Sequence, residues 1–124
     1  MAQRTPSFLI AVGVLAVAAA LAFWLRGATG RPFDPKAWRA DERVGDGVRQ
    51  EMADRIVARQ TLRGKSRAEV VDMLGEPPPH GNVTGWDMAY WLGLERGFIR
   101  LDSEWLIIRL GQDGRVQECR IYRD

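Results

Sequence analysis

The N-terminal part of the chain carries a long apolar run. Phe8 to Leu25 contains 18 consecutive uncharged, almost wholly apolar residues, and Arg4 and Arg26 bracket it. A run of this length predicts a transmembrane helix, because the apolar core of a signal peptide usually has about 7–15 residues. We therefore expect residues 1–26 to be a membrane anchor that contacts lipid through residues 8–25. A cleaved signal segment is the alternative.

Helical periodicity begins after a Gly-rich linker at residues 27–33. Asp34 followed by Pro35 predicts an N-cap and first helical position, and opens a short helix that carries Trp38. A second helix is expected over residues 48–60, where apolar residues recur every four positions at Val48, Met52 and Ile56. These helices open a single folded domain, expected to span residues 34–124.

A third helix is predicted in the stretch "LRGKSRAEVVDMLGEPPP". Its Gly-Lys-Ser fragment lacks the earlier glycine of a phosphate-binding loop, because Arg59 occupies that position. Ser66 and Glu69 instead have the spacing of a capping box, in which each side chain bonds the backbone N–H at the other's position. Gly75 and Pro77 then end the helix. We interpret the fragment as a helix start.

Beyond these prolines the apolar period changes from 3.6 to 2, which indicates strands. Three are expected, at Trp86–Leu92, Ser103–Leu110 and Arg115–Tyr122, with Asp113 and Gly114 as a two-residue hairpin turn between the last two. That turn fixes a register. One face would pair Leu110 with Gln117, Ile108 with Cys119 and Leu106 with Ile121, and the other Arg109 with Glu118, Ile107 with Arg120 and Trp105 with Tyr122.

The expected fold class is therefore α+β, with an N-terminal transmembrane helix followed by helices packed on one face of a three-stranded antiparallel meander. The other face would be open, and exposed aromatic side chains there would favour a protein partner. The candidate partner-binding residues are Trp105, Ile107, Tyr122, Trp86 and Tyr90, with Trp91 as the alternative to Tyr90 on the first strand. Alternatively, the segment with Trp38 or the loop with Phe98 covers this face.

Charge argues against nucleic-acid binding. The sequence pI is about 9.1, but removing residues 1–26 takes away Arg4 and Arg26 and leaves sixteen residues of each sign. No basic stripe with interleaved aromatic residues remains. We expect no nucleic-acid partner.

The polar residues form no recognisable catalytic set. Cys119 is the only cysteine, and its one possible histidine partner is His80 in a proline-rich loop. His80 with Asp87 or Asp102 lacks the spacing of a metal site. We therefore expect no catalytic residues, no cofactor, no metal and no small-molecule substrate, and a chain that is not an enzyme. A small-ligand-binding or enzymatic domain is the less favoured alternative.

The third predicted helix also carries a family resemblance. The pattern of Gly64, Val70, Leu74, Gly75 and Pro77 resembles the helix-turn signature of the BamE/SmpA/OmlA-like domain, a small fold of bacterial envelope proteins. The likeness extends over residues 48–122. It implies two helices with three strands and a non-enzymatic role in which the domain supports a membrane-protein assembly complex. Known members are lipoproteins, whereas this sequence has no cysteine near its N-terminus.

These features together predict a membrane-tethered, non-catalytic interaction domain that supports assembly or integrity of a bacterial cell-envelope complex. The envelope role requires the domain to lie outside the cytoplasm, on a single-pass anchor. The positive-inside rule argues in the other direction, because Arg26, Arg31, Lys36 and Arg39 follow the apolar run. A secreted or cytoplasm-facing binding domain of the same fold is the alternative.

Overall fold

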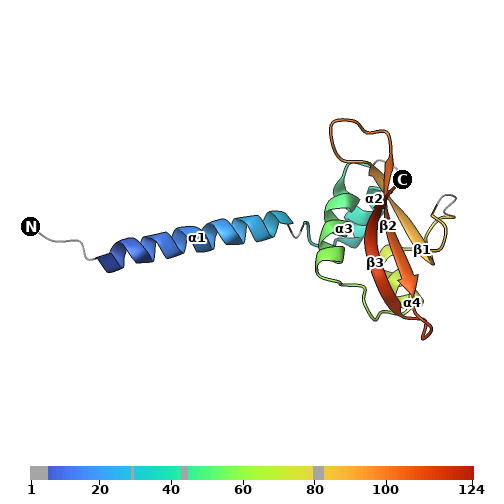
Figure 1. Cartoon of the computed structure of the whole chain (residues 1–124). Coiled ribbons are helices and arrows are strands. Elements are labelled where there is room, and N and C mark those ends of the chain that lie inside the picture. The colour runs from blue at the N-terminus through green and yellow to red at the C-terminus, as the bar shows by residue number, and fades with distance from the viewer. Residues whose placement is uncertain (1–5, 29, 43–44, 80–82) are drawn as a thin grey trace, which may run out of the picture.

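The computed structural model describes residues 6–28, 30–42, 45–79 and 83–124. Within these ranges, four helices precede three strands (Figure 1). The helices are α1 (Pro6–Ala28), α2 (Pro35–Ala40), α3 (Val48–Ala58) and α4 (Arg67–Leu74), and the strands are β1 (Met88–Leu94), β2 (Ser103–Leu110) and β3 (Val116–Arg123). This order confirms the α+β class and the antiparallel meander.

The membrane part of the expected fold is wrong. α1 extends away from the α+β domain (Figure 1). Crossing a bilayer takes a helix of about 20 consecutive, predominantly apolar residues. Within the part of the chain that the structure describes, no helix meets the requirements of length and apolar character for a membrane span. This finding contradicts both the transmembrane helix and the localisation as a single-pass membrane protein with its domain outside the cytoplasm.

Local signals in the sequence account for α2 and α4. The Asp34 carboxylate accepts a hydrogen bond from the backbone N–H of Lys36 at 3.0 Å, and Pro35 occupies the first helical position. At α4, the Ser66 hydroxyl accepts from the Glu69 N–H at 3.2 Å, while the Glu69 carboxylate accepts from the Ser66 N–H at 3.3 Å. The predicted capping box is therefore confirmed, and α4 begins at the next residue.

The segment expected to be a linker packs against the domain. The Arg31 N–H donates to the Glu51 carbonyl at 3.0 Å, and the Phe33 ring lies 6.0 Å from the Trp38 ring. Gly30 has φ +69°, and a Cβ atom there would lie 2.2 Å from the Glu51 oxygen. Only glycine allows this close approach to α3, so the packed part of the domain begins before the first predicted helix.

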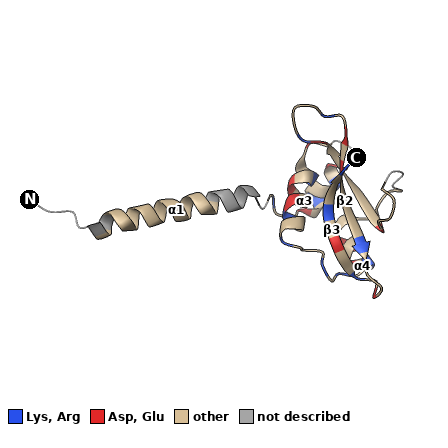
Figure 2. Cartoon of the chain, in the orientation of Figure 1, with Lys and Arg blue, Asp and Glu red and all other residues tan. Residues whose placement is uncertain are grey.

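The sheet has the order β1-β2-β3, with both neighbouring pairs antiparallel. The predicted register of the β2–β3 hairpin is confirmed from Trp105–Tyr122 to Arg109–Glu118. Charged residues recur along β3 (Figure 2). The first strand begins at Met88 instead of Trp86.

The hairpin turn differs from the prediction. Leu110 pairs with Val116 instead of Gln117, and the register shifts beside it. The Gly111 N–H donates to the Arg115 carbonyl at 2.8 Å, and Gly114 has φ +75°. The loop therefore has three residues with a left-handed glycine, a geometry that ends in a bulge and absorbs one residue of β3.

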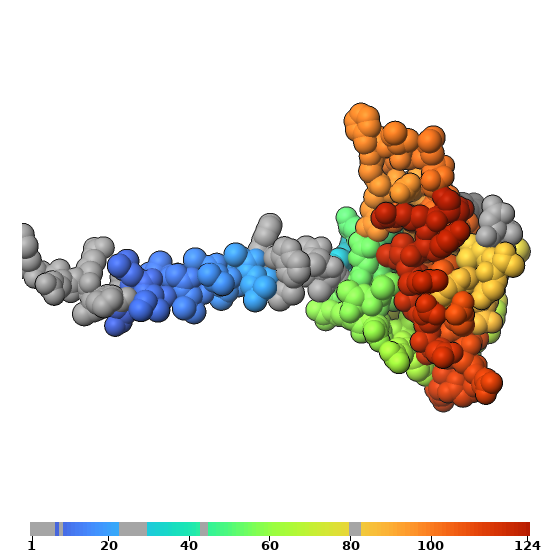
Figure 3. Space-filling view, in the orientation of Figure 1, coloured from blue at the N-terminus to red at the C-terminus, as the bar shows by residue number. Residues whose placement is uncertain are grey.

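The β1–β2 connection, residues 95–102, projects beyond the end of the sheet (Figure 3). It starts after the bulge at which Trp91 pairs with Trp105 and Gly93 with Glu104. Its base is closed by the Glu95 N–H, which donates to the Asp102 carbonyl at 2.7 Å.

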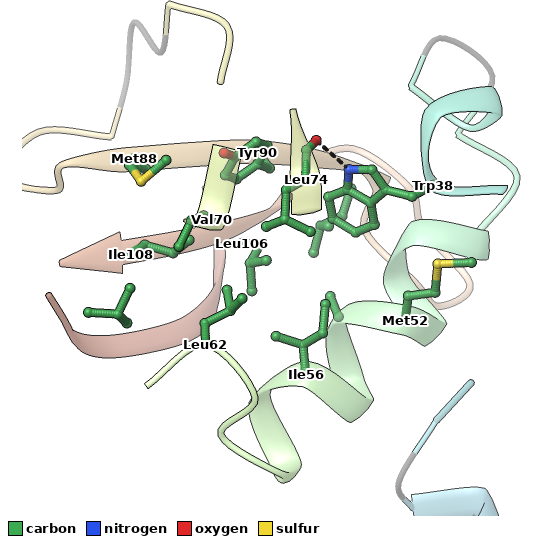
Figure 4. Packing of buried hydrophobic residues seen from close by; sticks show 13 residues of the cluster. Trp38, Met52, Ile56, Leu62, Val70, Leu74, Met88, Tyr90, Leu106 and Ile108 are labelled. Atoms are coloured by element: carbon green, nitrogen blue, oxygen red, sulfur yellow. Dashed lines mark hydrogen bonds between the residues drawn. The ribbon is translucent and has the colours of Figure 1, made fainter. Parts of the chain in front are cut away.

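The core lies between the helices and one face of the sheet (Figure 4). Trp38 is fully buried, and its indole N–H donates to the Leu74 carbonyl at 3.0 Å. Its ring meets the Tyr90 ring edge-on at 6.2 Å, and the Tyr90 hydroxyl donates to the Gly75 carbonyl at 2.7 Å. These contacts tie α2, the end of α4 and β1 together. The other core residues include Met52, Ile56, Leu62, Val70, Met88, Leu92, Leu106 and Ile108.

Candidate functional site

The sheet face opposite the helices, called here the outer face, carries a row of three aromatic residues. Trp91 lies beside Trp105 on β2, and Trp105 lies beside Tyr122 on β3. Trp91 and Trp105 are half-buried, and Tyr122 is exposed. The Trp105 indole N–H donates to the Asp124 carboxylate at 3.3 Å. This aromatic row crosses the sheet near the end from which the β1–β2 connection projects.

The chain itself covers part of the outer face. Val83 and Trp86 pack on Ala89 and Ile107, both of which are fully buried. The segment that covers these two residues precedes β1. The Trp91 ring is approached by Gly45, in the connection after the Trp38 helix, where an added Cβ atom would lie 3.0 Å from the ring. The Phe98 loop does not cover the face, because Phe98 is fully exposed.

Trp86 also lies between two arginines of the outer face. The guanidinium groups of Arg109 and Arg120 lie 4.3 and 4.8 Å from its ring centroid. Such cation–π contacts contribute about 0.5–1 kcal/mol each at exposed sites. Trp86 is therefore held on the sheet by charged side chains as well as by apolar ones.

The structure separates the five predicted partner-binding residues. Trp105, Tyr122 and Trp86 lie together on the outer face, with Ile107 buried beneath Trp86. Tyr90 points the other way and belongs to the core. The sequence offered Trp91 as the alternative to Tyr90 on the first strand, and Trp91 is the residue that lies on the outer face. The reason is the hydrogen bond from Tyr90 to Gly75, which α4 makes available only in the folded domain.

A second exposed feature was missed by sequence reasoning. In the β1–β2 connection, Phe98 is fully exposed, and Ile99 and Leu101 are 64% and 82% exposed. Leu94, at the end of β1, is 46% exposed. We call Leu94, Phe98, Ile99 and Leu101 the apolar loop. The sequence could have indicated this feature, because three large apolar residues stand together in a predicted loop. Large apolar side chains that gather on a surface usually mark a binding site.

The base of the apolar loop is fixed by a network around the fully buried carboxylate of Glu104. Arg96 donates from Nη2 to Glu104 Oε1 and from Nε to Oε2, both at 3.0 Å. The same guanidinium donates to both oxygens of Asp54 on α3, at 2.6 and 3.0 Å. Arg96 thus bridges helix and sheet by two-pronged contacts, the geometry in which arginine binds carboxylates most specifically.

Two further side chains complete the network. Gln50 Nε2 donates to Glu104 Oε2 at 2.5 Å and to the Leu94 carbonyl at 2.6 Å. Arg123 Nε donates to Glu104 Oε1 at 3.3 Å. Burial alone would raise the pKa of Glu104, but hydrogen bonds and positive charge from Arg96 and Arg123 outweigh it and hold that pKa below its ordinary value. The carboxylate therefore stays ionised beneath the loop.

Two features of the described residues bear on metal binding and on thiol reactivity. Within them, no group of three His, Cys, Asp or Glu side chains is placed to hold a metal ion. Burial raises the pKa of Cys119 to about 12, which opposes formation of a nucleophilic thiolate. His80, which the sequence offered as a ligand or base, lies outside the described residues.

Comparisons with known proteins identify no relative. The chain matches no family model, and it has no significant match to a curated protein or to a solved structure. The resemblance to the BamE/SmpA/OmlA-like domain therefore rests on the residues quoted for it alone.

Proposed function

We propose that this chain is a non-catalytic protein-binding domain whose partner docks on the apolar loop and on the neighbouring aromatic row. The observation that carries the proposal is the exposure of Phe98, Ile99 and Leu101 on a loop whose base is fixed by Arg96 and Glu104.

The energetics of this loop favour a binding role. Fully burying a large apolar side chain contributes roughly 1.5–3 kcal/mol, so the loop retains a binding free energy that the fold does not use. Its base is already ordered by the Arg96 bridge between α3 and β2, which lowers the entropy lost when a partner binds. An exposed apolar projection with an ordered base is suited to a concave apolar site on another protein.

The aromatic row supports the same surface. Trp105 and Tyr122 are neighbours across β2 and β3, and aromatic residues supply much of the energy of protein interfaces. Because Trp86 covers the middle of the outer face, the loop is the main contact in this proposal and the row is the second.

The test first captures the partner and then compares matched serine substitutions in the full chain. A photo-crosslinking amino acid in place of Phe98 should capture a partner in the cells that make this protein. The same group in place of Gln112, at the far hairpin, should not. Binding of that partner is then measured by calorimetry. Ile99→Ser should weaken binding, whereas Val14→Ser, which alters an equally exposed residue of α1, should not.

Equal binding by the Ile99→Ser and Val14→Ser variants would refute this site. Circular dichroism of both variants should match the parent, because the altered side chains are exposed. That the partner belongs to a cell-envelope complex stays a prediction from the family resemblance.

A further inference from the structure

The two edges of the sheet are treated differently by the fold. At the β1 edge, Arg49 Nη1 donates to the Trp91 carbonyl at 3.0 Å, and Gln50 Nε2 donates to the Leu94 carbonyl at 2.6 Å. These side chains occupy acceptors that an added strand would need. The β1 edge is therefore closed to further pairing at Trp91 and Leu94.

The β3 edge is closed only at its start. The Gly64 N–H donates to the Val116 carbonyl at 3.0 Å, and the Val116 N–H donates to the Lys65 carbonyl at 2.8 Å. Beyond Val116, none of the described segments pairs with β3 on the side away from β2. In Figure 3, β3 (red) lies at the front of the molecule, with α3 (green) on the side away from β2.

The hydrogen-bond pattern between β2 and β3 shows which N–H and C=O groups of β3 point away from β2. The Asp124 N–H donates to the Ser103 carbonyl, which marks this pair as hydrogen-bonded. In an antiparallel ladder such pairs alternate, so Tyr122, Arg120 and Glu118 also bond to β2. The N–H and C=O groups of the residues between them then point outward. These residues are Cys119, Ile121 and Arg123.

Two cavities lie beside β3. One, of about 210 Å³, is lined by α3 and β3, including Val57 and Cys119. The other, of about 530 Å³, is lined by residues that include Asp54 and Ile121. A strand added to the free edge lies in the plane of the sheet, about 4.8 Å from β3.

We propose that an extended segment of a partner protein adds to the free edge of β3 as a fourth antiparallel strand. The site is separate from the apolar loop and does not depend on the function proposed for it. Strand addition draws its affinity from main-chain hydrogen bonds and its specificity from alternate side chains. The outward N–H and C=O groups of Cys119, Ile121 and Arg123 are free to form these main-chain hydrogen bonds.

The side chains of β3 define the chemistry of the partner. On the outer face, Glu118 pairs with Arg109 at 3.3 Å and with Arg120 at 3.6 Å, and Glu118 and Arg120 remain 40% and 57% exposed. An added strand with a basic residue opposite Glu118 and a carboxylate opposite Arg120 extends this alternation of charge. Arg120 is held in place by its stacking on Trp86. On the face toward the helices, half-buried Cys119 and Ile121 favour apolar residues. The partner is thus an extended peptide with alternating charged and apolar residues.

A second copy of this chain fits the edge less well. A symmetric pairing centred on Arg120 places two arginines opposite each other, and one centred on Ile121 places Glu118 opposite Asp124. Like charges directly opposite are destabilising. A pairing centred on Cys119 extends the incoming strand to Val116, whose outward groups already bond to Gly64 and Lys65.

The test uses the full chain and the capped heptapeptide Val-Thr-Val-Glu-Val-Lys-Val as the probe. When the peptide pairs antiparallel with Arg123 to Gln117, its glutamate faces Arg120 and its lysine faces Glu118. Nuclear magnetic resonance titration should shift the amides of β3, and the amides of Cys119, Ile121 and Arg123 should become protected from exchange. No binding at millimolar peptide, or shifts confined to the apolar loop, would overturn the proposal.

Two methylated peptides provide the matched control. N-methylation of the first, third and fifth residues blocks the N–H groups that face β3 and should weaken binding by at least about tenfold. N-methylation of the second, fourth and sixth residues blocks the opposite edge and should leave binding nearly unchanged. If both methylation patterns changed the affinity equally, the peptide would bind without forming a fourth strand, and the proposal would be refuted.

Charge reversal tests the orientation of the bound strand. Arg120→Glu should weaken binding of the heptapeptide by up to about fivefold, and exchanging the peptide's glutamate for lysine should restore it. If the exchanged peptide does not bind Arg120→Glu more tightly, the predicted pairing is wrong. Ile99→Ser should bind the heptapeptide like the parent, so this site and the proposed function can fail separately.

Discussion

Arg96 holds Glu104 through two parallel hydrogen bonds at 3.0 Å, and this contact joins the exposed apolar loop to the buried end of β2. Glu104 is fully buried, whereas the Arg96 side chain remains 37% exposed. A loop that presents apolar residues to solvent is thereby anchored by an ion pair whose acidic partner is inaccessible to water.

Removing the charge of this carboxylate should destabilise the fold. Glu104→Gln leaves Arg96 and Arg123 without a buried counter-charge, and we expect the free energy of unfolding to fall by about 2–4 kcal/mol. Urea denaturation measures the loss. Glu118→Gln, which breaks the exposed pairs with Arg109 and Arg120, is the control and should cost less than about 1 kcal/mol. Equal losses in both variants would contradict the role of burial.

The same carboxylate predicts a pH dependence of stability. Its pKa is lower in the folded chain than in the unfolded chain, so the unfolded state takes up the proton first. The stabilisation from Glu104 is complete above the unfolded pKa of about 4.3 and declines as pH falls through that value toward the folded pKa. Urea midpoints of the parent should therefore drop more steeply between about pH 5 and 3 than those of Glu104→Gln. Parallel curves would show that other groups dominate.

Tyr90 should behave as a core residue. Its hydroxyl donates to the Gly75 carbonyl and is otherwise surrounded by the core, so Tyr90→Phe should lower the free energy of unfolding by about 0.5–1.5 kcal/mol. Binding of a partner at the outer face should not change. A variant with intact stability and impaired binding would place Tyr90 at the interface instead.

The capping box at the start of α4 allows a graded test. Ser66→Ala removes the acceptor for the Glu69 N–H and should cost about 1 kcal/mol of stability. Ser66→Gly should cost only a few tenths of a kcal/mol, because glycine is itself a fair N-cap. Thermal or urea unfolding of the two variants gives the ranking, and the reverse order would argue against the capping geometry.

Among the glycines that the structure describes, Gly30 has the least room for a side chain. Alanine there combines a left-handed φ with a Cβ placed 2.2 Å from the Glu51 oxygen, and should lower stability by about 2 kcal/mol or more. Gly64→Ala has a similar φ but meets no atom within 4 Å, so its cost should be limited to the backbone term of about 1–2 kcal/mol. Urea denaturation of both variants measures the difference. A Gly30→Ala variant no less stable than Gly64→Ala would refute the close contact with α3.

Much of the local structure was predictable because its causes are local. Ser66 and Glu69 are three residues apart, and their reciprocal bonds define the start of α4 with no help from the rest of the chain. The alternation along β2 and β3 likewise predicted the pairing of Trp105 with Tyr122. The turn beside Gly114 was predicted one residue too short, because two-residue and three-residue hairpins share the same Asp-Gly signal.

The candidate sites were less predictable. An alternating strand shows which residues share a face, but not which of the two faces the helices will cover. Tyr90 was assigned to the outer face and lies in the core, where α4 offers the Gly75 carbonyl. The apolar run at the N-terminus predicted a membrane span, which the structure contradicts.

The sequence by itself determined the α+β order of elements, the helix caps and most of the β2–β3 register, since these depend on residues close together in the chain. Tertiary structure alone decided which sheet face is covered, where Arg96 anchors the apolar loop and where the free edge of β3 begins. Each of these depends on partners such as Asp54, Glu104 and Lys65, which are brought together only by folding. Long-range contacts between polar groups leave no periodic pattern in a sequence, and the surfaces of this domain are made by such contacts.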